Sequence, residues 1–149
     1  MVNLKEQEIC NIMKDFRERT NILCSALFTE DGFIIAIDDP SYNIDEDFHQ
    51  TIVAICAGII SLASEGVEIF KADSKITQIT IQAGDQLDNE GFIIVLESIT
   101  EEIRYSILFP TFLNLGVIMF ELNQTLGKLS KFFLDVDLID DLESVSTSP

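Results

Sequence analysis

The sequence predicts an α/β (α+β) fold in which helices cover a five-stranded antiparallel sheet, with the element order α-β-β-α-β-β-β-α. Three observations predict it. Helical hydrophobic periodicity occurs near both ends of the chain, and a long uncharged helical segment occupies its middle. Five β-prone runs lie between these helices. Because the runs have the length of hairpin strands, we expect one antiparallel sheet rather than a parallel one.

Each of the two terminal helices carries one apolar stripe. Over residues 4–18 the apolar side chains recur at the i, i+3, i+4 and i+7 spacing of an amphipathic helix. The last helix is predicted over residues 114–133, and Asn114 is suited to cap its first turn. Its stripe consists of Leu115, Ile118, Met119, Leu122, Leu126, Leu129 and Phe133.

The first two strands form a predicted hairpin. Ile22–Thr29 and Phe33–Asp38 are β-prone runs on either side of Glu30-Asp31-Gly32. A short loop that ends in Asp-Gly is a strong hairpin signal, because glycine accepts the positive φ that the turn needs. The other three strands are predicted over residues 76–83, 92–98 and 103–109.

A long apolar helix is predicted between the second and third strands. Residues 48–64 read FHQTIVAICAGIISLAS and contain no charged residue. The helix should start near Asp45, whose carboxylate can cap the first amides, and end near Ile69. Two apolar stripes run along it, yet one sheet can bury only one side of a helix. The stripe assigned to the protein's own sheet consists of Phe48, Ile52, Ile55, Ile59 and Leu62.

The second apolar stripe of this helix is predicted to contact a second copy of the chain. Its small residues would let another helix approach closely across a two-fold axis. The strand over residues 76–83 would otherwise be a long exposed edge without proline, and pairing with its copy would remove that edge. The predicted dimer interface consists of Val53, Cys56, Ala57, Gly58, Ile60, Ser61, Thr77, Ile79 and Ile81.

The charge balance restricts the kind of partner. The chain has 149 residues and a formal net charge of −17, and between Thr20 and Phe70 it carries nine acidic residues and no basic one. Such a surface repels phosphate backbones and anionic lipid, which argues against nucleic acid and charged membranes as partners. We expect one domain over residues 1–134, followed by an acidic, partly disordered tail over residues 135–149.

The sequence gives no support for membrane insertion or secretion. The uncharged stretch reaches only the lower length limit of a membrane span, and its flanks are acidic on both sides. The three cysteines show no paired spacing, and the first residues lack an apolar signal region. We therefore expect a cytoplasmic protein.

The sequence also offers no recognisable catalytic motif. A single histidine cannot build a histidine metal cluster, and neither a GxSxG elbow nor a GxxxxGK[ST] phosphate loop occurs. We expect no enzymatic activity, no metal and no cofactor. Candidate partner-binding residues are polar groups at the start of the central helix and apolar groups in the acidic tail: Asp45, Glu46, His49, Ile139 and Leu142.

The combined pattern resembles the Roadblock/LC7 family over about residues 5–133. The resemblance rests on the element order, the SALFTEDGFIIA hairpin, the apolar central helix, the GFIIVLES strand and the ILFPTFLNLG segment. It is similar above all to the prokaryotic members that work with small Ras-like GTPases. The resemblance implies a profilin/longin-like Roadblock fold and a dimer in which the central helices pair and the third strands join two sheets. The acidic tail departs from the short members of the family.

The function that the resemblance implies is a non-catalytic dimer that binds a small Ras-like GTPase, as a scaffold or as an activating or modulating partner. The alternative is a small-ligand-binding sensory domain of the PAS/GAF/profilin-like type, although the strands offer few polar side chains for a pocket. The arginines Arg17, Arg19 and Arg104 do not lie in loops suited to reach a partner's nucleotide. Activation would therefore reposition the GTPase's own groups.

Overall fold

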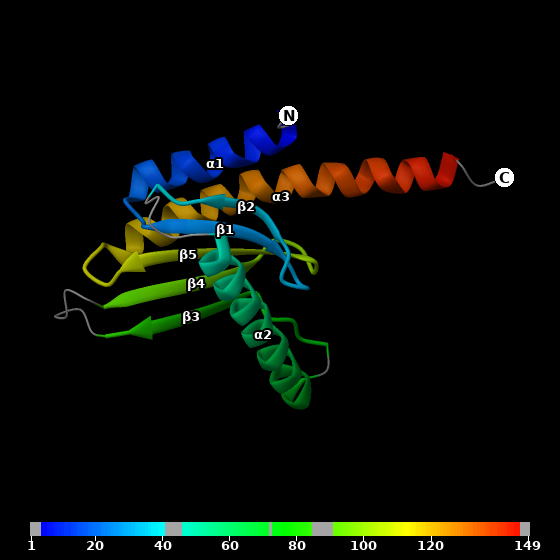
Figure 1. Ribbon diagram of the computed structural model, residues 1–149. Coiled ribbons are helices and arrows are strands. Elements are labelled where there is room, and N and C mark those ends of the chain that lie inside the picture. Colours follow the sequence, from blue (N-terminus) through cyan, green and yellow to red (C-terminus); the bar gives the residue numbers. More distant parts are fainter. Residues whose placement is uncertain (1–3, 41–45, 72, 85–90, 147–149) are drawn as a thin grey trace.

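The fold is an antiparallel sheet between two layers of helices, as predicted (Figure 1). It is seen in a computed structural model that describes residues 4–40, 46–71, 73–84 and 91–146, without the side chains of residues 46 and 134–146. The elements are α1 (Leu4–Thr20), β1 (Cys24–Thr29), β2 (Ile34–Asp38), α2 (Glu46–Phe70), β3 (Gln78–Ala83), β4 (Phe92–Ser98), β5 (Ile103–Pro110) and α3 (Leu115–Ser146).

The five strands form one sheet in the order β2-β1-β5-β4-β3, and every neighbouring pair is antiparallel. The β1–β2 and β4–β5 pairs are hairpins, whereas β1 pairs with β5 across the long excursion through α2, β3 and β4. This order leaves β2 and β3 as the two edges of the sheet.

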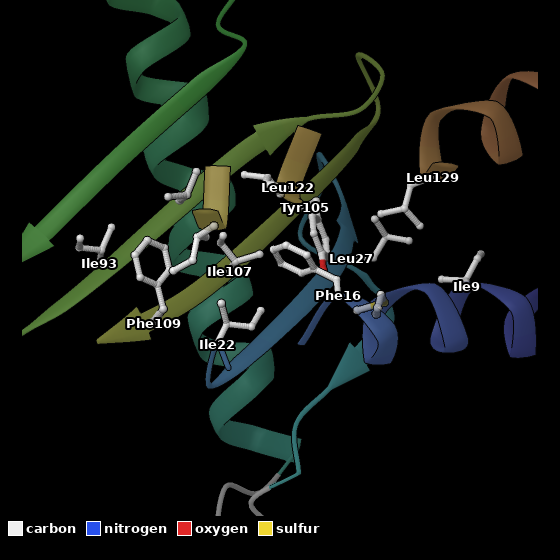
Figure 2. Close-up of a cluster of buried hydrophobic side chains, with 13 residues drawn as sticks. Ile9, Phe16, Ile22, Leu27, Ile93, Tyr105, Ile107, Phe109, Leu122 and Leu129 are labelled. Atoms are coloured by element: carbon white, nitrogen blue, oxygen red, sulfur yellow. The ribbon is translucent and has the colours of Figure 1, made fainter. Parts of the chain in front are cut away.

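Helices α1 and α3 lie side by side on one face of the sheet, and α2 crosses the other face (Figure 1). Alternation along β5 sends Tyr105, Ile107 and Phe109 toward α1 and α3, where Phe16 and Leu122 meet them (Figure 2). This larger core contains most of the fully buried side chains. The α2 side holds a smaller cluster, which makes α2 the less completely covered helix.

Local signals in the sequence place the turns as predicted. Gly32 closes the β1–β2 hairpin with φ of 89°, and its amide donates to the Thr29 carbonyl oxygen at 2.9 Å. At the start of α3, the Asn114 side-chain oxygen accepts a hydrogen bond from the Val117 amide at 3.1 Å. Asn114 is therefore the N-cap that the sequence predicts.

The last helix is longer than the sequence predicts. We expect it to end at Phe133, where the acidic tail begins, but the backbone of α3 is helical to Ser146. In Figure 1 this part of α3 extends past the N-terminal end of α1. The domain boundary at residue 134 and the partial disorder of the tail stay predictions. The side chains of Ile139 and Leu142 lie outside the described residues.

Candidate functional site

The candidate site lies on α2. The side of α2 that packs against the sheet determines which of its side chains remain exposed. Val53, Cys56 and Ile60 are 1%, 3% and 6% exposed and lie against the protein's own sheet. Their neighbours on the strands include Ala26 and Leu96. The spacing i, i+3, i+7 puts these three side chains on one side of the helix. Contact with the sheet buries this side.

This arrangement corrects the assignment of the two apolar stripes. The sequence analysis places Val53, Cys56 and Ile60 at a dimer interface, but the sheet already covers them. The stripe assigned to the sheet is the one that is partly open, since Ile55 and Leu62 are 53% and 71% exposed. Val53, Cys56 and Ile60 form the side buried against the sheet, Ile52 and Ile59 pack at its margin, and Ile55 and Leu62 point away from it.

The open side of α2 carries what we call the open ridge, formed by Phe48, Ile55, Leu62 and Ile69. These residues recur every seven positions, and their exposure rises along the helix from 43% at Phe48 to 85% at Ile69. Ile52 and Ile59 lie between them and are half-buried. A seven-residue apolar repeat with intermediate positions at i+4 is the pattern by which two helices pack along a seam.

The helix from Asp47 to Phe70 is also long and apolar enough to cross a membrane, judged by length and composition alone. Only 17% of its most apolar window is buried inside the protein. Contact of Val53, Cys56 and Ile60 with the sheet fixes one side of α2 as a core helix. What needs explanation is therefore the other side, because a contiguous apolar surface of this kind usually marks an interaction site.

Small residues flank the open ridge on the side of the β1–β2 hairpin. Ala57 is half-buried, whereas Gly58 and Ser61 are exposed. A side chain at Gly58 would meet nothing within 4 Å, so this position is open to an approaching partner. Of the predicted interface residues on α2, Gly58 and Ser61 are thus accessible, and Ala57 is partly so.

Strand β3 is an edge of the sheet next to the open ridge, as predicted. Its Ile79 and Ile81 are half-buried on the α2 face, and Ile79 packs against the smaller core. Thr77 is exposed and precedes the strand, where its carbonyl oxygen accepts from the Ser98 amide at 3.0 Å. One backbone side of β3 pairs with β4, and within the described residues the other side has no neighbouring strand.

Of the candidate partner-binding residues at the start of α2, the structure describes the side chain of His49. His49 is 7% exposed, and its Nε2 is hydrogen-bonded to Asp39 Oδ2 at 2.8 Å. His49 therefore links α2 to the end of β2, and its role in partner binding stays a prediction. Asp45 and the Glu46 side chain lie outside the described residues.

An acidic groove lies between the C-terminal half of α2 and the two hairpin turns. Glu65 and Glu68 of α2 line it together with Glu30 and Asp31 of the β1–β2 turn. Arg104 of β5 lies at its base, and burial lowers the pKa of its guanidinium. The groove adjoins the open side of α2, so the whole side of the molecule combines apolar and acidic groups.

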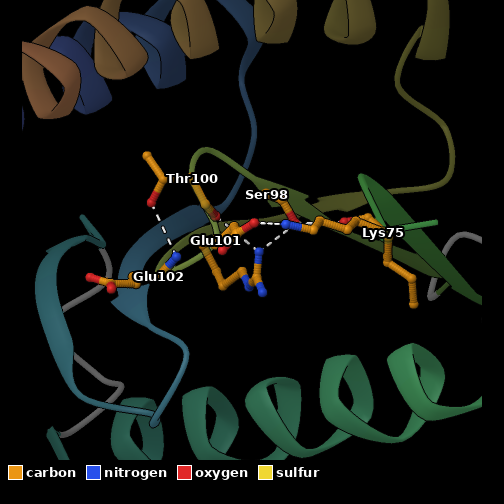
Figure 3. Close-up of polar contacts among 7 residues, drawn as sticks. Lys75, Ser98, Thr100, Glu101 and Glu102 are labelled. Carbon is orange, nitrogen blue, oxygen red and sulfur yellow. Dashed lines mark hydrogen bonds and ion pairs between the residues drawn. The ribbon is translucent and has the colours of Figure 1, made fainter. Parts of the chain in front are cut away.

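The β4–β5 turn that borders this groove is held by a network of hydrogen bonds (Figure 3). Arg104 Nη1 donates to Ser98 Oγ at 2.7 Å and to the Thr100 carbonyl oxygen at 3.0 Å. Thr100 Oγ1 accepts from the Glu102 amide at 3.1 Å. Lys75 forms an ion pair with Glu101 beside the turn. Arg104 is thus tied to its own turn and does not extend from it.

The other two arginines are also engaged within the chain. Arg17 Nε donates to Asp38 Oδ2 at 2.7 Å, and Arg19 pairs with Asp15 at 2.6 Å and with Glu121 at 3.2 Å. All three arginines therefore make contacts inside the molecule. A partner's nucleotide would not meet a free guanidinium here.

Other reactive groups are sparse in the part of the chain that the structure describes. No group of three or more His, Cys, Asp or Glu side chains there is arranged to hold a metal ion. Burial raises the pKa of the Cys24 thiol to about 12 and also raises that of Cys56, so both remain protonated at neutral pH. The side chains of the site can bind through apolar contact and charge.

Comparison with known proteins identifies the fold. A scan against protein-family models and a search of curated proteins find no match to the sequence. Among solved structures, Myxococcus xanthus MglB is 14% identical with a TM-score of 0.75 over 91% of this chain and 94% of its own. The gliding protein MglB of Thermus thermophilus is 11% identical, with a TM-score of 0.74 over 89% and 93%.

A Roadblock/LC7 domain from Streptomyces avermitilis is 13% identical, with a TM-score of 0.70 over 84% of this chain and 97% of its own. These structures cover nearly the whole described fold at low identity. The chain therefore shares the Roadblock/LC7 fold with MglB, as the resemblance in its sequence implies.

Proposed function

We propose that this protein is a non-catalytic dimer that binds and regulates a small Ras-like GTPase. The observation that carries the proposal is the open ridge of α2 beside the free edge of β3, on a Roadblock/LC7 fold. The ridge and the edge each need a partner, for separate physical reasons. A second copy of the chain satisfies both at once.

The ridge favours a partner because exposure of apolar side chains to water is unfavourable in free energy. Leu62 and Ile69 are 71% and 85% exposed, and burying each is worth about 1.5–3 kcal/mol. In the proposed dimer, the ridge of one α2 packs against the ridge of the other around a two-fold axis. Gly58 and Ser61 next to it let the two helices approach closely.

The edge needs cover because unpaired backbone groups invite aggregation. Antiparallel pairing of β3 with its own copy would extend the sheet across the dimer and occupy the free groups of residues 78–83. Ile79 and Ile81 would then lie next to their counterparts beneath the paired helices. This places the predicted β3 residues in the same interface as the open ridge.

The acidic groups around the ridge favour a GTPase with a basic face. Glu30, Asp31, Glu65 and Glu68 line the groove beside the ridge, and the chain has no basic residue between Thr20 and Phe70. Opposite charges across an interface raise the association rate and select against wrong partners. Because the three arginines are engaged within the chain, regulation would act by repositioning the GTPase's own catalytic groups.

The alternative of a small-ligand sensory domain receives less support. Pockets for drug-sized ligands measure about 300–1,000 Å³ and enclose most of the ligand. The apolar cavity beneath α2 has a volume of about 70 Å³, well below that range, and the acidic groove of about 370 Å³ is lined mostly by charged and polar side chains. A sensory ligand of ordinary size does not fit this cavity.

The test uses a Ras-like GTPase from the same cell, loaded with GTP, and the full-length protein. We expect saturable binding and a changed rate of GTP hydrolysis, and we expect Leu62→Asp to lose both. Phe120→Asp is the matched control, since Phe120 is 63% exposed but lies on α3 on the opposite side of the sheet. Equal binding and hydrolysis with both variants, or none with the wild type, would overturn the proposal.

A further inference from the structure

The exposed side of α3 differs in charge from the rest of the molecule. The chain has 26 Asp and Glu residues against 9 Lys and Arg. Over residues 115–133 of α3, by contrast, the exposed charged residues are Lys128 and Lys131. The single acid in this range, Glu121, is half-buried and pairs with Arg19 at 3.2 Å. This side of α3 is therefore locally basic.

The same side of α3 exposes apolar and small residues. Phe120 is 63% exposed and Val117 is 50% exposed. Gln124 and Gly127 are exposed farther along, and a side chain at Gly127 would meet nothing within 4 Å. What we call the outer face of α3 consists of Val117, Phe120, Gln124, Gly127, Lys128 and Lys131. This face is open to an approaching helix.

Helix α3 also continues past the body of the molecule. Its backbone is helical to Ser146, and in Figure 1 its last part extends past the N-terminal end of α1. Residues 134–146 read LDVDLIDDLESVS and contain five acidic residues and no basic one. Because they continue the same helix, they cannot fold back onto the outer face of their own chain. They are placed to reach the outer face of a second copy.

One line of positions runs from the outer face into residues 134–146. Positions three or four residues apart stay on one side of a helix, and this spacing continues from Phe120 to Val145. The line consists of Phe120, Gln124, Gly127, Lys131, Leu134, Leu138, Leu142 and Val145. Alternating steps of three and four between mainly apolar positions are the pattern by which two helices pack along a seam. The line is therefore a candidate seam between α3 and another helix.

We propose that two copies of the chain associate through α3, with residues 134–146 of each copy on the outer face of the other. The positions match in an antiparallel pair centred on Lys131. Phe120 lies eleven residues before Lys131 and Leu142 lies eleven residues after it, about 16 Å along the helix in each direction. Leu142 of one copy thus lies opposite Phe120 of the other, and both apolar positions are removed from water.

Charge selects the acidic segment of a second copy as the occupant and sets the direction of the pair. The same register places Asp135 of one copy beside Lys128 of the other. Opposite charges on the flanks of a helix pair determine its partner and orientation. A parallel pair would instead place each acidic residue of the segment beside its own copy, and like charges across a contact are unfavourable. The antiparallel pair is therefore the arrangement that the sequence of α3 favours.

The α3 pair is weaker than the proposed α2 dimer. Gln124, Gly127 and Lys131 interrupt the apolar seam in its middle, and a polar residue at a seam position costs stability. Each copy also carries a formal net charge of −17, which opposes contact between copies. We therefore expect the α3 pair at submillimolar concentration, above the micromolar range in which the α2 dimer forms.

The test uses the full-length Leu62→Asp variant, which lacks the proposed α2 contact, in sedimentation equilibrium up to submillimolar concentration. We expect reversible association of monomers into pairs. Phe120→Asp and Leu142→Asp, each added to this variant, should abolish the pairs, because a carboxylate replaces an apolar seam residue. Phe33→Asp is the matched control and should change nothing, since Phe33 is 70% exposed but precedes β2. Absence of pairs, or pairs that survive Leu142→Asp, would overturn the inference.

A charge exchange tests the register of the pair. Lys128→Glu should raise the dissociation constant of the pair roughly tenfold, because it puts a carboxylate beside Asp135 of the second copy. Lys14→Glu changes the net charge equally on the exposed side of α1 and should have little effect. Adding Asp135→Lys to Lys128→Glu should restore most of the affinity. The two positions are seven residues apart, farther than the three or four at which side chains of one helix meet, so recovery reports a contact between copies. No recovery would contradict the antiparallel pair.

The inference does not depend on the proposed α2 dimer or its GTPase partner, because α3 and α2 lie on opposite faces of the sheet. If the α2 dimer were wrong, the wild type would be monomeric at micromolar concentration and would still form α3 pairs at higher concentration. If the α3 pair were wrong, the wild type would stay dimeric throughout the concentration series. The two failures are therefore distinguishable.

Discussion

Glu97 is a buried carboxylic acid near the end of β4, after five apolar residues. It is 8% exposed on β4, and Gln78 Nε2 of the neighbouring edge strand donates a hydrogen bond to its Oε1. Burial raises the pKa of Glu97, and the bond from Gln78 offsets part of that rise. The folded protein therefore holds the Glu97 proton more tightly than the unfolded chain does.

This shift predicts a pH dependence of stability. The stabilisation is complete below the ordinary glutamate pKa and is lost as the pH rises through the raised pKa of the folded state. Glu97→Gln mimics the protonated acid, so its free energy of unfolding relative to wild type should increase with pH across that window. Urea unfolding of both proteins at a series of pH values measures this. A difference that is independent of pH would contradict the assignment.

The bond between Arg17 and Asp38 is the residue-scale link between α1 and β2. The two side chains are 20% and 13% exposed, and the bond raises the pKa of Arg17. Asp38→Asn should lower the free energy of unfolding by about 1–2 kcal/mol, because hydrogen bonds to charged groups are the stronger ones. Asp15→Asn breaks an exposed bond to Arg19 and should cost under about 0.5 kcal/mol. Equal losses in both variants would contradict the role of burial.

Helix α2 packs against the sheet with one side and exposes apolar side chains on the other. Ile60 is 6% exposed against the sheet, and Leu62, two residues later, is 71% exposed on the open ridge. The same substitution at these neighbouring positions should therefore have different effects. This contrast separates the folding role of the helix from its proposed binding role.

Ile60→Asp would place an unpaired charge in the smaller core, so we expect a loss of more than about 3 kcal/mol and largely unfolded protein. Leu62→Asp should keep the far-UV circular dichroism of the wild type, because the new carboxylate faces solvent in the monomer. Circular dichroism and urea unfolding of both variants check this. A folded Ile60→Asp protein would contradict the orientation of α2.

The sequence correctly predicts turns and helix starts whose geometry depends on neighbouring residues. Gly32 and Asn114 act as predicted because turn and cap geometry depend on neighbouring residues. The orientation of α2 could not be predicted, because both of its stripes are apolar and periodicity alone does not choose between them. The bond between His49 and Asp39 could not be predicted, because Asp39 lies ten residues away and is brought near only by the fold.

At the scale of the whole molecule, the two helical layers differ in how much of their apolar surface is buried. The layer of α1 and α3 encloses the larger core, including Phe16, Tyr105 and Leu129 (Figure 2). The α2 layer leaves its open ridge, its acidic groove and the edge of β3 on one side. A dimer built on that side would give the fold a second, shared core.

Sedimentation velocity at micromolar concentration tests this central claim most directly. The wild type and Phe120→Asp should sediment as dimers, and Leu62→Asp should sediment as a monomer with the circular dichroism of the wild type. The reason is that Leu62 lies on the open ridge, whereas Phe120 lies on α3 on the opposite side of the sheet. A monomeric wild type, or a Leu62→Asp protein that stays dimeric, would contradict the account.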